Sequence, residues 1–470
     1  MKKVITFGSF DLFHEGHYNL LKRAKALGDV LVVGVTTEQY DNFRGKMNVV
    51  DSLMSRVDNV RQTGFADEII IEDHEGQKLE EIQKHGIDIF TVGSDWRGKF
   101  DYLAEYCEVV YLERTRDVSS TILRQERMGI IRLGIVGTGR IAGRFMSELV
   151  YVSGVEPSGV YNPRYDSSRV FGEIYGISSY FGSYEKFLEK VDAVYVATPH
   201  DTHYDYTLKA LQMGKHVLCE KPMVLSEHEA RELFDAAAEK KLVLMEAVKT
   251  AYAPGFLNLL AIARGGRIGT IYDVEAAFTK LTPYAPFARE YDPVVGGSFT
   301  ELSSYSLLPI AKLLGHDYKE LEFTSFPAEN GCDFYAKACF RYDNAIATAK
   351  TGIGVKSEGQ LQISGTKGYI LVKSPWWLLK TFEVCYESAE DNETFSAPFP
   401  GYGLRFELAD FIRNISDPTH QNFKFSRGDS IFMSAVIERF LKSTRKNIPE
   451  MTRHRSRTMK RTYGPVGTNS

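Results

Sequence analysis

The chain has 470 residues, and its 57 basic and 61 acidic side chains give a formal net charge of −4. A charge this close to neutral argues against a dedicated nucleic-acid-binding protein, and the length exceeds what one typical domain needs. No run of about 18 apolar residues predicts a transmembrane helix, and the basic start at 1–3 leads into a strand-like run unlike a signal peptide. We therefore expect a cytoplasmic, multidomain protein without a membrane or nucleic-acid partner. Its five cysteines lack metal-ligand spacing, which predicts reduced thiols and no protein-bound metal site.

The first predicted elements are a strand at 4–7 and a helix that begins within the segment GSFDLFHEGH at 8–17. The glycine-containing turn after the strand leaves room for a triphosphate. His14 and His17 lie three residues apart and therefore share one face of the helix. A helix start presents free N–H groups and the positive end of its dipole to anions, and two imidazoles add further donors. This segment therefore predicts phosphate binding.

A second phosphate-binding segment, RTRDVSST, lies at 114–121. Its end at 119–121 is a cap-like run before an apolar stretch, so it predicts another helix N-terminus that faces phosphates. Arg114 and Arg116 add positive charge nearby. Together, the two segments predict a nucleotide-binding site that transfers a nucleotidyl group.

Residues 1–128 resemble the glycerol-3-phosphate cytidylyltransferases of the HxGH nucleotidyltransferase superfamily. The resemblance rests on MKKVITFGSFDLFHEGH, LGDVLVVGVTT, VGSDWRGKFDYL and EVVYLERTRDVSST, all at the family's spacing. It implies a Rossmann-like domain that transfers CMP from CTP, with Mg²⁺, to a polyol phosphate. The residues that it implies for the nucleotide are Gly8, Phe10, Asp11, His14, His17, Lys46, Asp95, Arg114, Ser119 and Thr121, of which His14, His17, Lys46 and Arg114 are the catalytic candidates. Arg56 is implied on the acceptor side.

The acceptor side departs from the family pattern at two places. Gly64 stands where family members carry a basic residue, and a tryptophan expected near His74 is missing. The acceptor can therefore differ from glycerol 3-phosphate.

A second strand–turn–helix unit begins at 130–142 with IIRLGIVGTGRIA, whose glycine pattern ends in Ala142 instead of a third glycine. Further strands are predicted to end at 159–162 and at 191–197, and helical patterns separate them. This alternation predicts a doubly wound parallel sheet that binds a dinucleotide at the carboxyl ends of its strands.

Three later segments, VATPHDTHYDYTLKAL at 196–211, GKHVLCEKPMVLS at 214–226 and GGSFTELSSYSLLP at 296–309, resemble the Gfo/Idh/MocA oxidoreductases. The resemblance covers 130 to about 445 and implies an NAD(P)-dependent enzyme. It implies that Lys221 lies beside the nicotinamide and the substrate carbonyl. The cofactor-binding residues are predicted to be Gly137, Gly139, Arg140, Ile141, Asn162, Arg164, Thr198, Pro199, His203 and Glu220.

The resemblance also implies that Glu301 and Tyr305 complete the catalytic site. A hydride that reaches a carbonyl leaves negative charge on its oxygen, which the Lys221 ammonium can stabilise and the Tyr305 phenol can protonate. Glu301 replaces the usual aspartate, and Ser303 and Ser304 stand where a glycine is common. The reach of this acid therefore stays open.

The cofactor preference depends on the end of the second strand, which reads YNPR at 161–164. An NAD-specific site usually places an acid there for the ribose hydroxyl, and none is present. Arg164 can pair with a 2′-phosphate, which favours NADP(H) over NAD(H). His200 and His203 have the spacing of metal ligands, but no third ligand follows, so we interpret them as residues at the cofactor edge.

These patterns predict an α/β protein with four parts: a cytidylyltransferase domain at 1–128, a dinucleotide-binding Rossmann domain at 130–250, an α+β open-sheet domain at 251–445 and a basic, disordered tail at 446–470. The open sheet is expected to bind substrate and to mediate homo-oligomers. Amphipathic runs at 406–412 and 432–440 predict helices that return onto this sheet.

The two resemblances together suggest a bifunctional enzyme. Its second part would reduce a ketose or aldose phosphate to a polyol phosphate, and its first part would then form a CDP-polyol of the CDP-glycerol or CDP-ribitol type for cell-wall or capsule polymers. Two alternatives stay open. The second part is either a non-catalytic oligomerisation or sensing module, or one of two independent enzymes on one chain.

Overall fold

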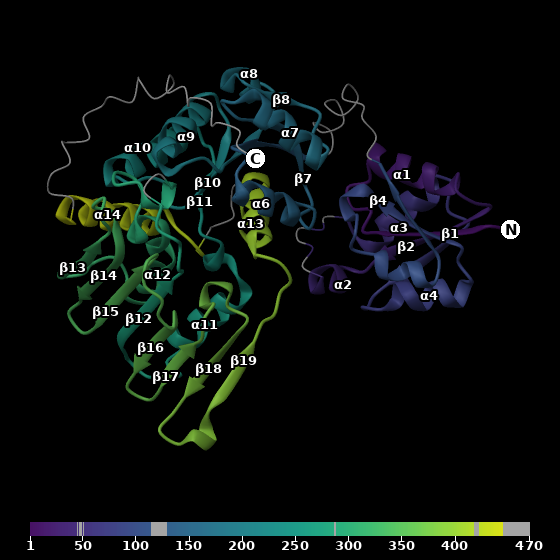
Figure 1. Cartoon of the computed structure of the whole chain (residues 1–470). Helices are drawn as coiled ribbons and strands as arrows, with labels where there is room; N and C mark the ends of the chain where they lie inside the picture. Colours follow the sequence, from purple (N-terminus) through teal and green to yellow (C-terminus); the bar gives the residue numbers. More distant parts are fainter. Residues whose placement is uncertain are drawn as a thin grey trace.

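The computed structural model describes residues 1–44, 46, 49, 51–113, 129–285, 288–417 and 423–444. Within these residues the chain forms three sheets, and Figure 1 shows the second sheet between the first and the third. The predicted tail at 446–470 lies outside the described residues, as do Arg114, Ser119 and Thr121. None of the described helices combines the length and apolar character that a bilayer crossing requires.

The first sheet has five parallel strands in the order β3-β2-β1-β4-β5. Its central strands are buried valine- and isoleucine-rich runs, as expected for a parallel sheet covered on both faces. The strands are β1 (Lys3–Gly8), β2 (Val30–Thr36), β3 (Glu68–Glu72), β4 (Ile89–Gly93) and β5 (Glu108–Leu112). The helical segments are α1 (Glu15–Lys25), α2 (Glu38–Phe43), α3 (Leu53–Gln62), α4 (Gln77–His85), η1 (Ser94–Trp96) and η2 (Asp101–Glu105).

The second sheet has six parallel strands in the order β11-β10-β9-β6-β7-β8. This is the doubly wound arrangement that the sequence predicts. The strands are β6 (Ile131–Val136), β7 (Val155–Tyr161), β8 (Tyr180–Phe181), β9 (Ala193–Val196), β10 (His216–Glu220) and β11 (Leu244–Ala247). The helical segments are α6 (Arg140–Leu149), α7 (Tyr165–Tyr175), α8 (Tyr184–Leu188), η3 (His200–Thr202), α9 (His203–Gln212) and α10 (Glu227–Glu239).

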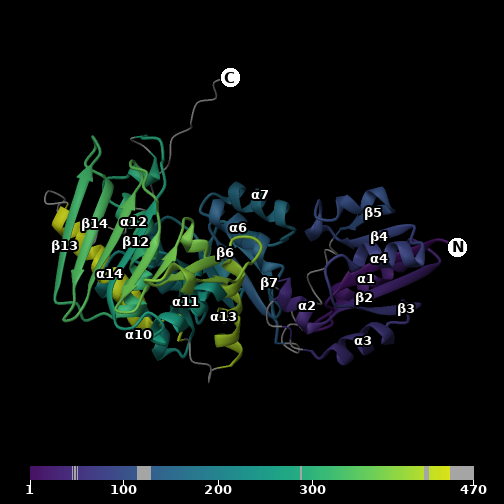
Figure 2. The same cartoon turned by 90° about the horizontal axis from the view of Figure 1, so that it is seen from below.

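The third sheet has eight strands, β13-β14-β15-β12-β16-β17-β18-β19, and every neighbouring pair is antiparallel except β12 with β15. The strands are β12 (Ile271–Thr279), β13 (Glu320–Pro327), β14 (Asp333–Arg341), β15 (Ile346–Gly352), β16 (Leu361–Gly365), β17 (Tyr369–Val372), β18 (Thr381–Cys385) and β19 (Glu393–Ser396). Its helical segments are η4 (Lys249–Tyr252), α11 (Pro254–Arg264), η5 (Arg289–Tyr291), α12 (Ser298–Leu314), η6 (Trp376–Leu378), η7 (Ala389–Asp391), α13 (Leu404–Ser416) and α14 (Arg427–Thr444). Burial alternates along β14 because α12 covers only one face (Figure 2).

One of the two C-terminal helices does not pack where the sequence predicts. α14 packs on α12 and β13, as expected, but α13 packs on α6 and η4 at the second sheet. Every residue from Leu404 to Ile412 of α13 is buried, and Arg405 forms a buried ion pair with Glu148 of α6 at 2.7 Å. Amphipathicity alone cannot identify the surface that a helix covers, and this buried pair requires α6.

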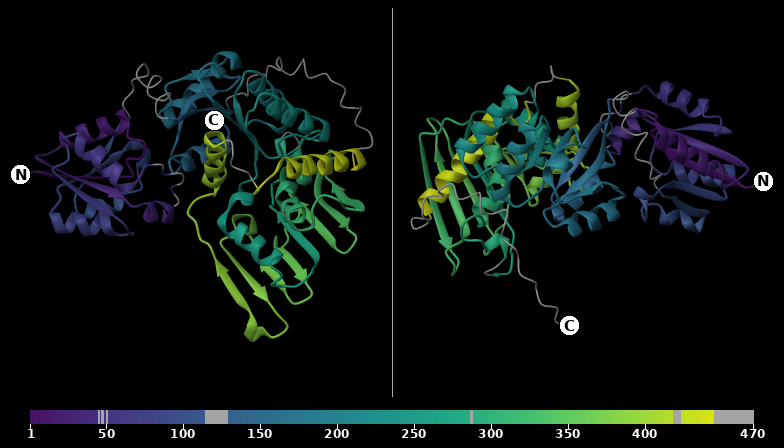
Figure 3. Two further views of the ribbon diagram at one scale, coloured as in Figure 1. Left: turned by 180° about the vertical axis from the view of Figure 1, so that it is seen from behind. Right: turned by 90° about the horizontal axis from the view of Figure 1, so that it is seen from above.

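The first sheet contacts the second through a small cluster around Tyr151, and Figure 3 shows the two bodies side by side. Lys99 Nζ donates to the Tyr151 hydroxyl at 2.7 Å, and the Trp96 ring meets the Tyr151 ring edge-on. On the other side of Tyr151, the Arg405 guanidinium lies 3.7 Å from the ring centroid and donates to the Arg44 carbonyl.

Candidate functional site

The first candidate site lies where α1 begins, after β1. His14 is the N-cap of α1, and its Nδ1 accepts from the Gly16 amide at 3.0 Å. The rings of His14 and His17 stack with centroids 4.0 Å apart, so the two residues share one face as predicted. A Cβ on Gly16 would lie 2.7 Å from the His14 ring, which explains the glycine between them.

The neutral imidazole of His17 is suited to contact an anion. Its Nδ1 is buried and has no hydrogen-bond partner among the described residues. Burial, followed by the charges of His14 and Lys46, lowers the pKa of His17 well below its ordinary value. An uncharged imidazole keeps one N–H donor, and a phosphate group is one ligand that can use it.

The loop between β1 and α1 is strained. Phe10 and Leu12 have positive φ angles of 51° and 47°, which residues other than glycine rarely adopt. Asp51 holds this loop, because its amide donates to Asp11 Oδ1 at 2.8 Å and its Oδ2 accepts from the Leu12 amide at 2.9 Å. Such conformations cost about 1–3 kcal/mol each and persist where the surroundings enforce them, often at ligand sites. A Cβ on Gly8 would lie 3.1 Å from the Phe10 ring.

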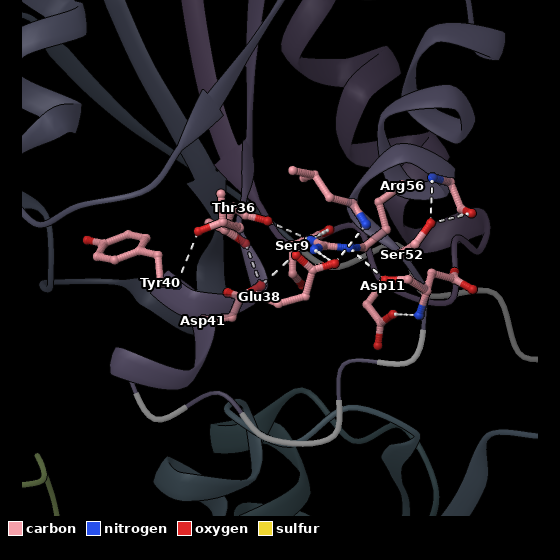
Figure 4. A network of polar contacts seen from close by, with 12 residues as sticks. Ser9, Asp11, Thr36, Glu38, Tyr40, Asp41, Ser52 and Arg56 are labelled. Carbon is pink, nitrogen blue, oxygen red and sulfur yellow. Dashed lines mark hydrogen bonds and ion pairs between the residues drawn. The ribbon is translucent and has the colours of Figure 1, made fainter.

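Arg56 lies inside this scaffold and is fully buried (Figure 4). Its guanidinium donates to the carbonyls of Ser9 and Thr36 at 2.8 and 2.7 Å, which joins the ends of β1 and β2. It also donates to the Asp51 carbonyl at 3.1 Å and lies 3.6 Å from Asp41 Oδ2. The side chain expected to touch the acceptor thus contacts backbone and carboxylates in this structure.

Lys46 and Asp95 are the other predicted residues of the first site that the structure describes, and both lie at this sheet edge. The Lys46 amide donates to the Asp41 carbonyl at 2.7 Å, and burial lowers the pKa of Lys46 although Asp41 and Asp11 oppose the shift. Asp95 is exposed on η1, directly after β4. Because β1 and β4 are neighbours whose connections run in opposite directions, this edge is the switch point of the sheet, where such folds bind ligands.

The second candidate site begins at the glycine turn after β6. Gly137 has a φ of 97°, and a Cβ there would lie 2.5 Å from the Ala197 carbonyl, so only glycine fits. Beside Gly139, by contrast, nothing lies within 4 Å of the position a Cβ would take. Gly139 caps α6 without a side-chain hydrogen bond, so open space adjoins the first amides of α6, at Arg140 and Ile141. This geometry fits a dinucleotide pyrophosphate.

The end of β7 is tied to this turn. Asn162 Nδ2 donates to the Thr138 hydroxyl at 2.9 Å, and Asn162 Oδ1 accepts from the Arg164 amide at 2.9 Å. Arg164 itself is exposed at the start of α7, so its guanidinium is accessible beside the turn. The side chains predicted to distinguish the two nicotinamide cofactors are therefore at the expected strand end.

Three predicted catalytic residues meet at the carboxyl end of β10. Lys221 Nζ donates to the Glu301 carbonyl at 2.9 Å and lies 5.5 Å from the centroid of the Tyr305 ring. Burial, followed by the charges of Glu220 and Glu407, raises the pKa of Tyr305. The phenol therefore keeps its proton at neutral pH. An ammonium and a protonated phenol thus lie side by side, which suits the protonation of a developing alkoxide.

The residues behind Lys221 are buried and hydrogen bonded. Glu220 accepts from the Tyr195 hydroxyl at 2.6 Å and from the Lys221 amide at 3.2 Å, and burial raises its pKa. Both ring nitrogens of His203 lie against backbone carbonyls, of Pro222 at 2.9 Å and Thr198 at 2.8 Å. Neither nitrogen is accessible to a metal, which agrees with a place at the cofactor edge. Pro199, the residue after Thr198, is exposed.

Two ionisable residues beside the second site were missed by sequence reasoning. Arg289 on η5 lies 2.9 Å from His200 Nε2 through its Nη2 and 3.5 Å from Glu301 Oε1. The loop that carries it has no motif, and only its place shortly before GGSFTE hinted at the site. Glu407 on α13 is fully buried, neither carboxyl oxygen has a hydrogen-bond partner among the described residues, and burial raises its pKa well above the usual range. A glutamate in an otherwise apolar helical face was its only signal.

Comparison with known proteins assigns the first part of the chain and the part that follows it to different families. The family model described as cytidylyltransferase-like matches residues 5–126. A glycerol-3-phosphate cytidylyltransferase from Bacillus spizizenii is 48% identical over 126 residues, which cover 27% of this chain and 97% of that protein. Through this segment the chain belongs to the cytidylyltransferase-like family. One from Staphylococcus aureus is 39% identical over 129 residues, with 97% of it covered.

The following segment carries a Gfo/Idh/MocA oxidoreductase domain. The model of the oxidoreductase family with an NAD-binding Rossmann fold matches residues 131–248. D-xylose 1-dehydrogenase (NADP(+)) from Hypocrea jecorina is 28% identical over 308 residues, 58% of this chain and 78% of that enzyme. A 3-ketoreductase from Actinomadura kijaniata, solved with NADP, shares the fold with a TM-score of 0.56 at 23% identity, covering 66% of this chain and 96% of that one.

The chain is therefore an enzyme that joins a CTP-using nucleotidyltransferase domain to a nicotinamide-dependent oxidoreductase domain, and the enzymes that it resembles act on small molecules. Both parts have the α/β architecture with parallel Rossmann-like sheets, and the third sheet forms the C-terminal part of the oxidoreductase.

Proposed function

We propose that the enzyme makes a CDP-activated polyol in two consecutive steps. The oxidoreductase domain reduces the carbonyl of a sugar phosphate to give a polyol phosphate, and the cytidylyltransferase domain then transfers CMP to that phosphate. The observation that carries the proposal is the presence of an oxidoreductase domain and a cytidylyltransferase-like domain on one chain. The product of the first chemistry, a polyol phosphate, is the class of acceptor that the second requires.

In the reduction, Lys221 and Tyr305 act on the carbonyl oxygen. The bound reduced nicotinamide supplies the hydride. Lys221 stabilises the negative charge that grows on the oxygen, and Tyr305, which keeps its proton because burial raises its pKa, can donate it. Glu301 contributes its carbonyl to the position of the Lys221 ammonium. Glu220 holds the Lys221 backbone from behind.

In the transfer, an oxygen of the polyol phosphate attacks the α-phosphorus of CTP. A new P–O bond forms, the bond between the α-phosphorus and its bridging oxygen breaks, and pyrophosphate leaves with that oxygen. The protein supplies no nucleophile, so positioning and charge neutralisation carry the catalysis. We assign this role to His14, His17 and Lys46, together with Arg114, Ser119 and Thr121 of the second motif.

Three further assignments belong to the proposal. Mg²⁺ would accompany the triphosphate, with Asp11 and Asp95 as the carboxylates that follow the neighbouring strands β1 and β4. Arg56, buried and bonded to the loop that carries Asp11, would act on the acceptor by positioning this loop. For the reduction, NADPH is the preferred cofactor because Arg164 lies beside a strand end without an acid.

The proposal is tested by comparing the two half-reactions over one panel of triose to hexose phosphates. Oxidation of NADPH identifies the sugar phosphates that are reduced, and release of pyrophosphate from CTP identifies the polyol phosphates that accept CMP. The best acceptor should be the reduction product of the best sugar phosphate. Two unmatched preferences would indicate independent enzymes, and no reduction of any carbonyl compound would indicate a non-catalytic second part.

A further inference from the structure

Arg289 contacts Glu301 beside Lys221 and is a cation that the mechanism does not use. Arg289 belongs to η5, in the loop that leads from β12 to α12, and its side chain is 48% exposed. The two residues it touches, His200 and Glu301, are only 5% and 15% exposed. The guanidinium therefore lies between two largely buried side chains and solvent.

The contact with His200 fixes which group donates. A guanidinium has only N–H donors, so His200 Nε2 accepts the 2.9 Å hydrogen bond. Burial, followed by the charges of Arg289, His203 and Lys221, lowers the pKa of His200 well below its ordinary value, so the imidazole is neutral. Its proton then resides on Nδ1, 3.7 Å from Glu301 Oε1. His200 thus orients the arginine and adds no charge.

Most of the guanidinium remains available for a ligand. Only Nη2 makes a hydrogen bond, to His200, and within the part of the chain that the structure describes, Nε and Nη1 make none. Its contact with Glu301 Oε1, at 3.5 Å, is longer than a hydrogen bond, and half-exposed ion pairs of this kind stabilise a fold little. Fold stability alone is therefore a weak reason for an arginine here.

The arginine and the catalytic lysine converge on the same residue. Lys221 Nζ donates to the Glu301 carbonyl, and Arg289 lies beside the Glu301 carboxyl group. Both cations also lower the pKa of His200, so both are within electrostatic reach of one imidazole. Lys221 and an arginine with unused, fork-shaped donors therefore adjoin the same residue, Glu301.

We propose that Arg289 is the anion anchor of the reduction site and binds the phosphate monoester of the sugar phosphate while Lys221 faces its carbonyl. This assignment rests on the proposed function and makes the oxidoreductase domain select phosphorylated substrates. A guanidinium can grip two phosphate oxygens with parallel N–H donors, which fixes the orientation of the carbon chain as well as its charge. His200 is then a positioning residue for Arg289.

The test compares one sugar phosphate with its unphosphorylated sugar in the full-length enzyme. Arg289→Ala should lower kcat/KM for the phosphorylated substrate by roughly 10- to 100-fold, the usual range for a hydrogen bond to a charged group, and change that for the free sugar by less than threefold. Arg289→Lys should recover part of the loss, because it restores the charge without the fork. Arg267→Ala removes an exposed arginine that pairs with Glu393 and serves as the matched control.

The outcomes separate this proposal from the proposed function. Equal losses for both substrates in Arg289→Ala, or no preference for the phosphate in the parent enzyme, would overturn the anchor. If the parent reduces no sugar phosphate, the proposed function fails, and the anchor is then decided by titrating the NADPH complex with inorganic phosphate and following NADPH fluorescence. Weaker phosphate binding in Arg289→Ala than in Arg267→Ala would support the anchor, and equal binding would refute it.

Discussion

The two parallel sheets of this chain place their candidate sites at equivalent edges but equip them for different chemistry. At the first sheet, the imidazole of His14 stacks on that of His17, whose pKa is lowered, at a helix start, and this pair suits a ligand that already carries its full charge. At the second sheet, Lys221 and a protonated Tyr305 lie side by side and suit a substrate that acquires charge during the reaction. The same architecture thus supports two reactions because different side chains follow its strands.

The two sites also differ in how they are assembled. The described part of the first site comes from one sheet and is held by the strained 9–12 loop and by the buried Arg56. The second needs two sheets, because Lys221 follows β10, whereas Tyr305 and Arg289 come from α12 and η5 beside the third sheet. Single substitutions should therefore separate the two activities, and we rank the predictions by expected size.

The largest effect is expected from Lys221→Met, which keeps the length of the side chain but removes its charge and proton. Reduction should fall by roughly 1,000-fold or more, because charge stabilisation and proton donation are lost together. CMP transfer from supplied polyol phosphate should stay within twofold of the parent. Single-turnover oxidation of NADPH measures the rate of hydride transfer. The control is Lys209→Met, because the Lys209 side chain is 43% exposed. Hydride transfer at the parental rate would remove Lys221 from the mechanism.

The converse separation is expected from His17→Ala. CMP transfer should fall by roughly 100- to 1,000-fold, the cost of one donor to a transition-state anion, while reduction is unchanged. Release of pyrophosphate from CTP provides the measurement. His228→Ala serves as the control, since His228 is an exposed histidine of α10 that pairs with Glu232. If His17→Ala retained near-normal synthesis of CDP-polyol, the phosphate-facing assignment of α1 would be wrong.

Near the second site, the buried Glu246 of β11 should make the free energy of unfolding depend on pH. Burial raises its pKa to about 7 from 4.5, although Glu246 Oε1 accepts from the Met223 amide at 3.0 Å. A raised pKa means that the folded state binds more protons, so this stability is present below pH 4.5 and is lost as pH rises through 7. Once the pH exceeds 7, the free energy of unfolding has fallen by about 3 kcal/mol.

Glu246→Gln removes the ionisable group and keeps an acceptor for the amide. At pH 8 it should raise the free energy of unfolding by up to about 3 kcal/mol, and at pH 4.5 it should change little. Urea unfolding followed by circular dichroism at both pH values gives the comparison, with the exposed Glu275→Gln as control. The same change at both pH values would show that Glu246 does not titrate in this range.

The smallest effect concerns the choice between cofactors at the second sheet. Arg164→Ala should weaken NADPH binding by roughly 10- to 100-fold and NADH binding by less than threefold, because only the former has a 2′-phosphate for the guanidinium. Dissociation constants for NADPH and NADH, measured by cofactor fluorescence, test this preference. Arg169→Ala, which removes an exposed arginine paired with Glu173, controls for surface charge. Equal weakening for both cofactors would assign Arg164 to the adenosine or to the surface.

The same difference in assembly explains what could be predicted from sequence. Local patterns predicted the parallel sheets and the shared face of His14 and His17, since each rests on a strand end and the helix that follows. The convergence of Lys221 with Tyr305 was implied by the family resemblance, because these residues come from β10 and α12, which are far apart in the chain. Long-range contacts could not be read this way. α13 looked like a helix for the open sheet, yet it packs on α6 because of Arg405 and Glu148. Arg289 reaches the site from a loop without regular periodicity.

The central claim is that both sites act in turn on one phosphorylated carbon chain, and deuterium transfer tests it most directly. The enzyme is incubated in one vessel with CTP, Mg²⁺, a sugar phosphate and NADPH that carries deuterium at the transferred position, and the products are weighed by mass spectrometry. We predict a CDP-polyol one mass unit heavier than the product made with unlabelled NADPH. A CDP adduct without the label, or a labelled polyol phosphate that is never converted to a CDP adduct, would contradict the account.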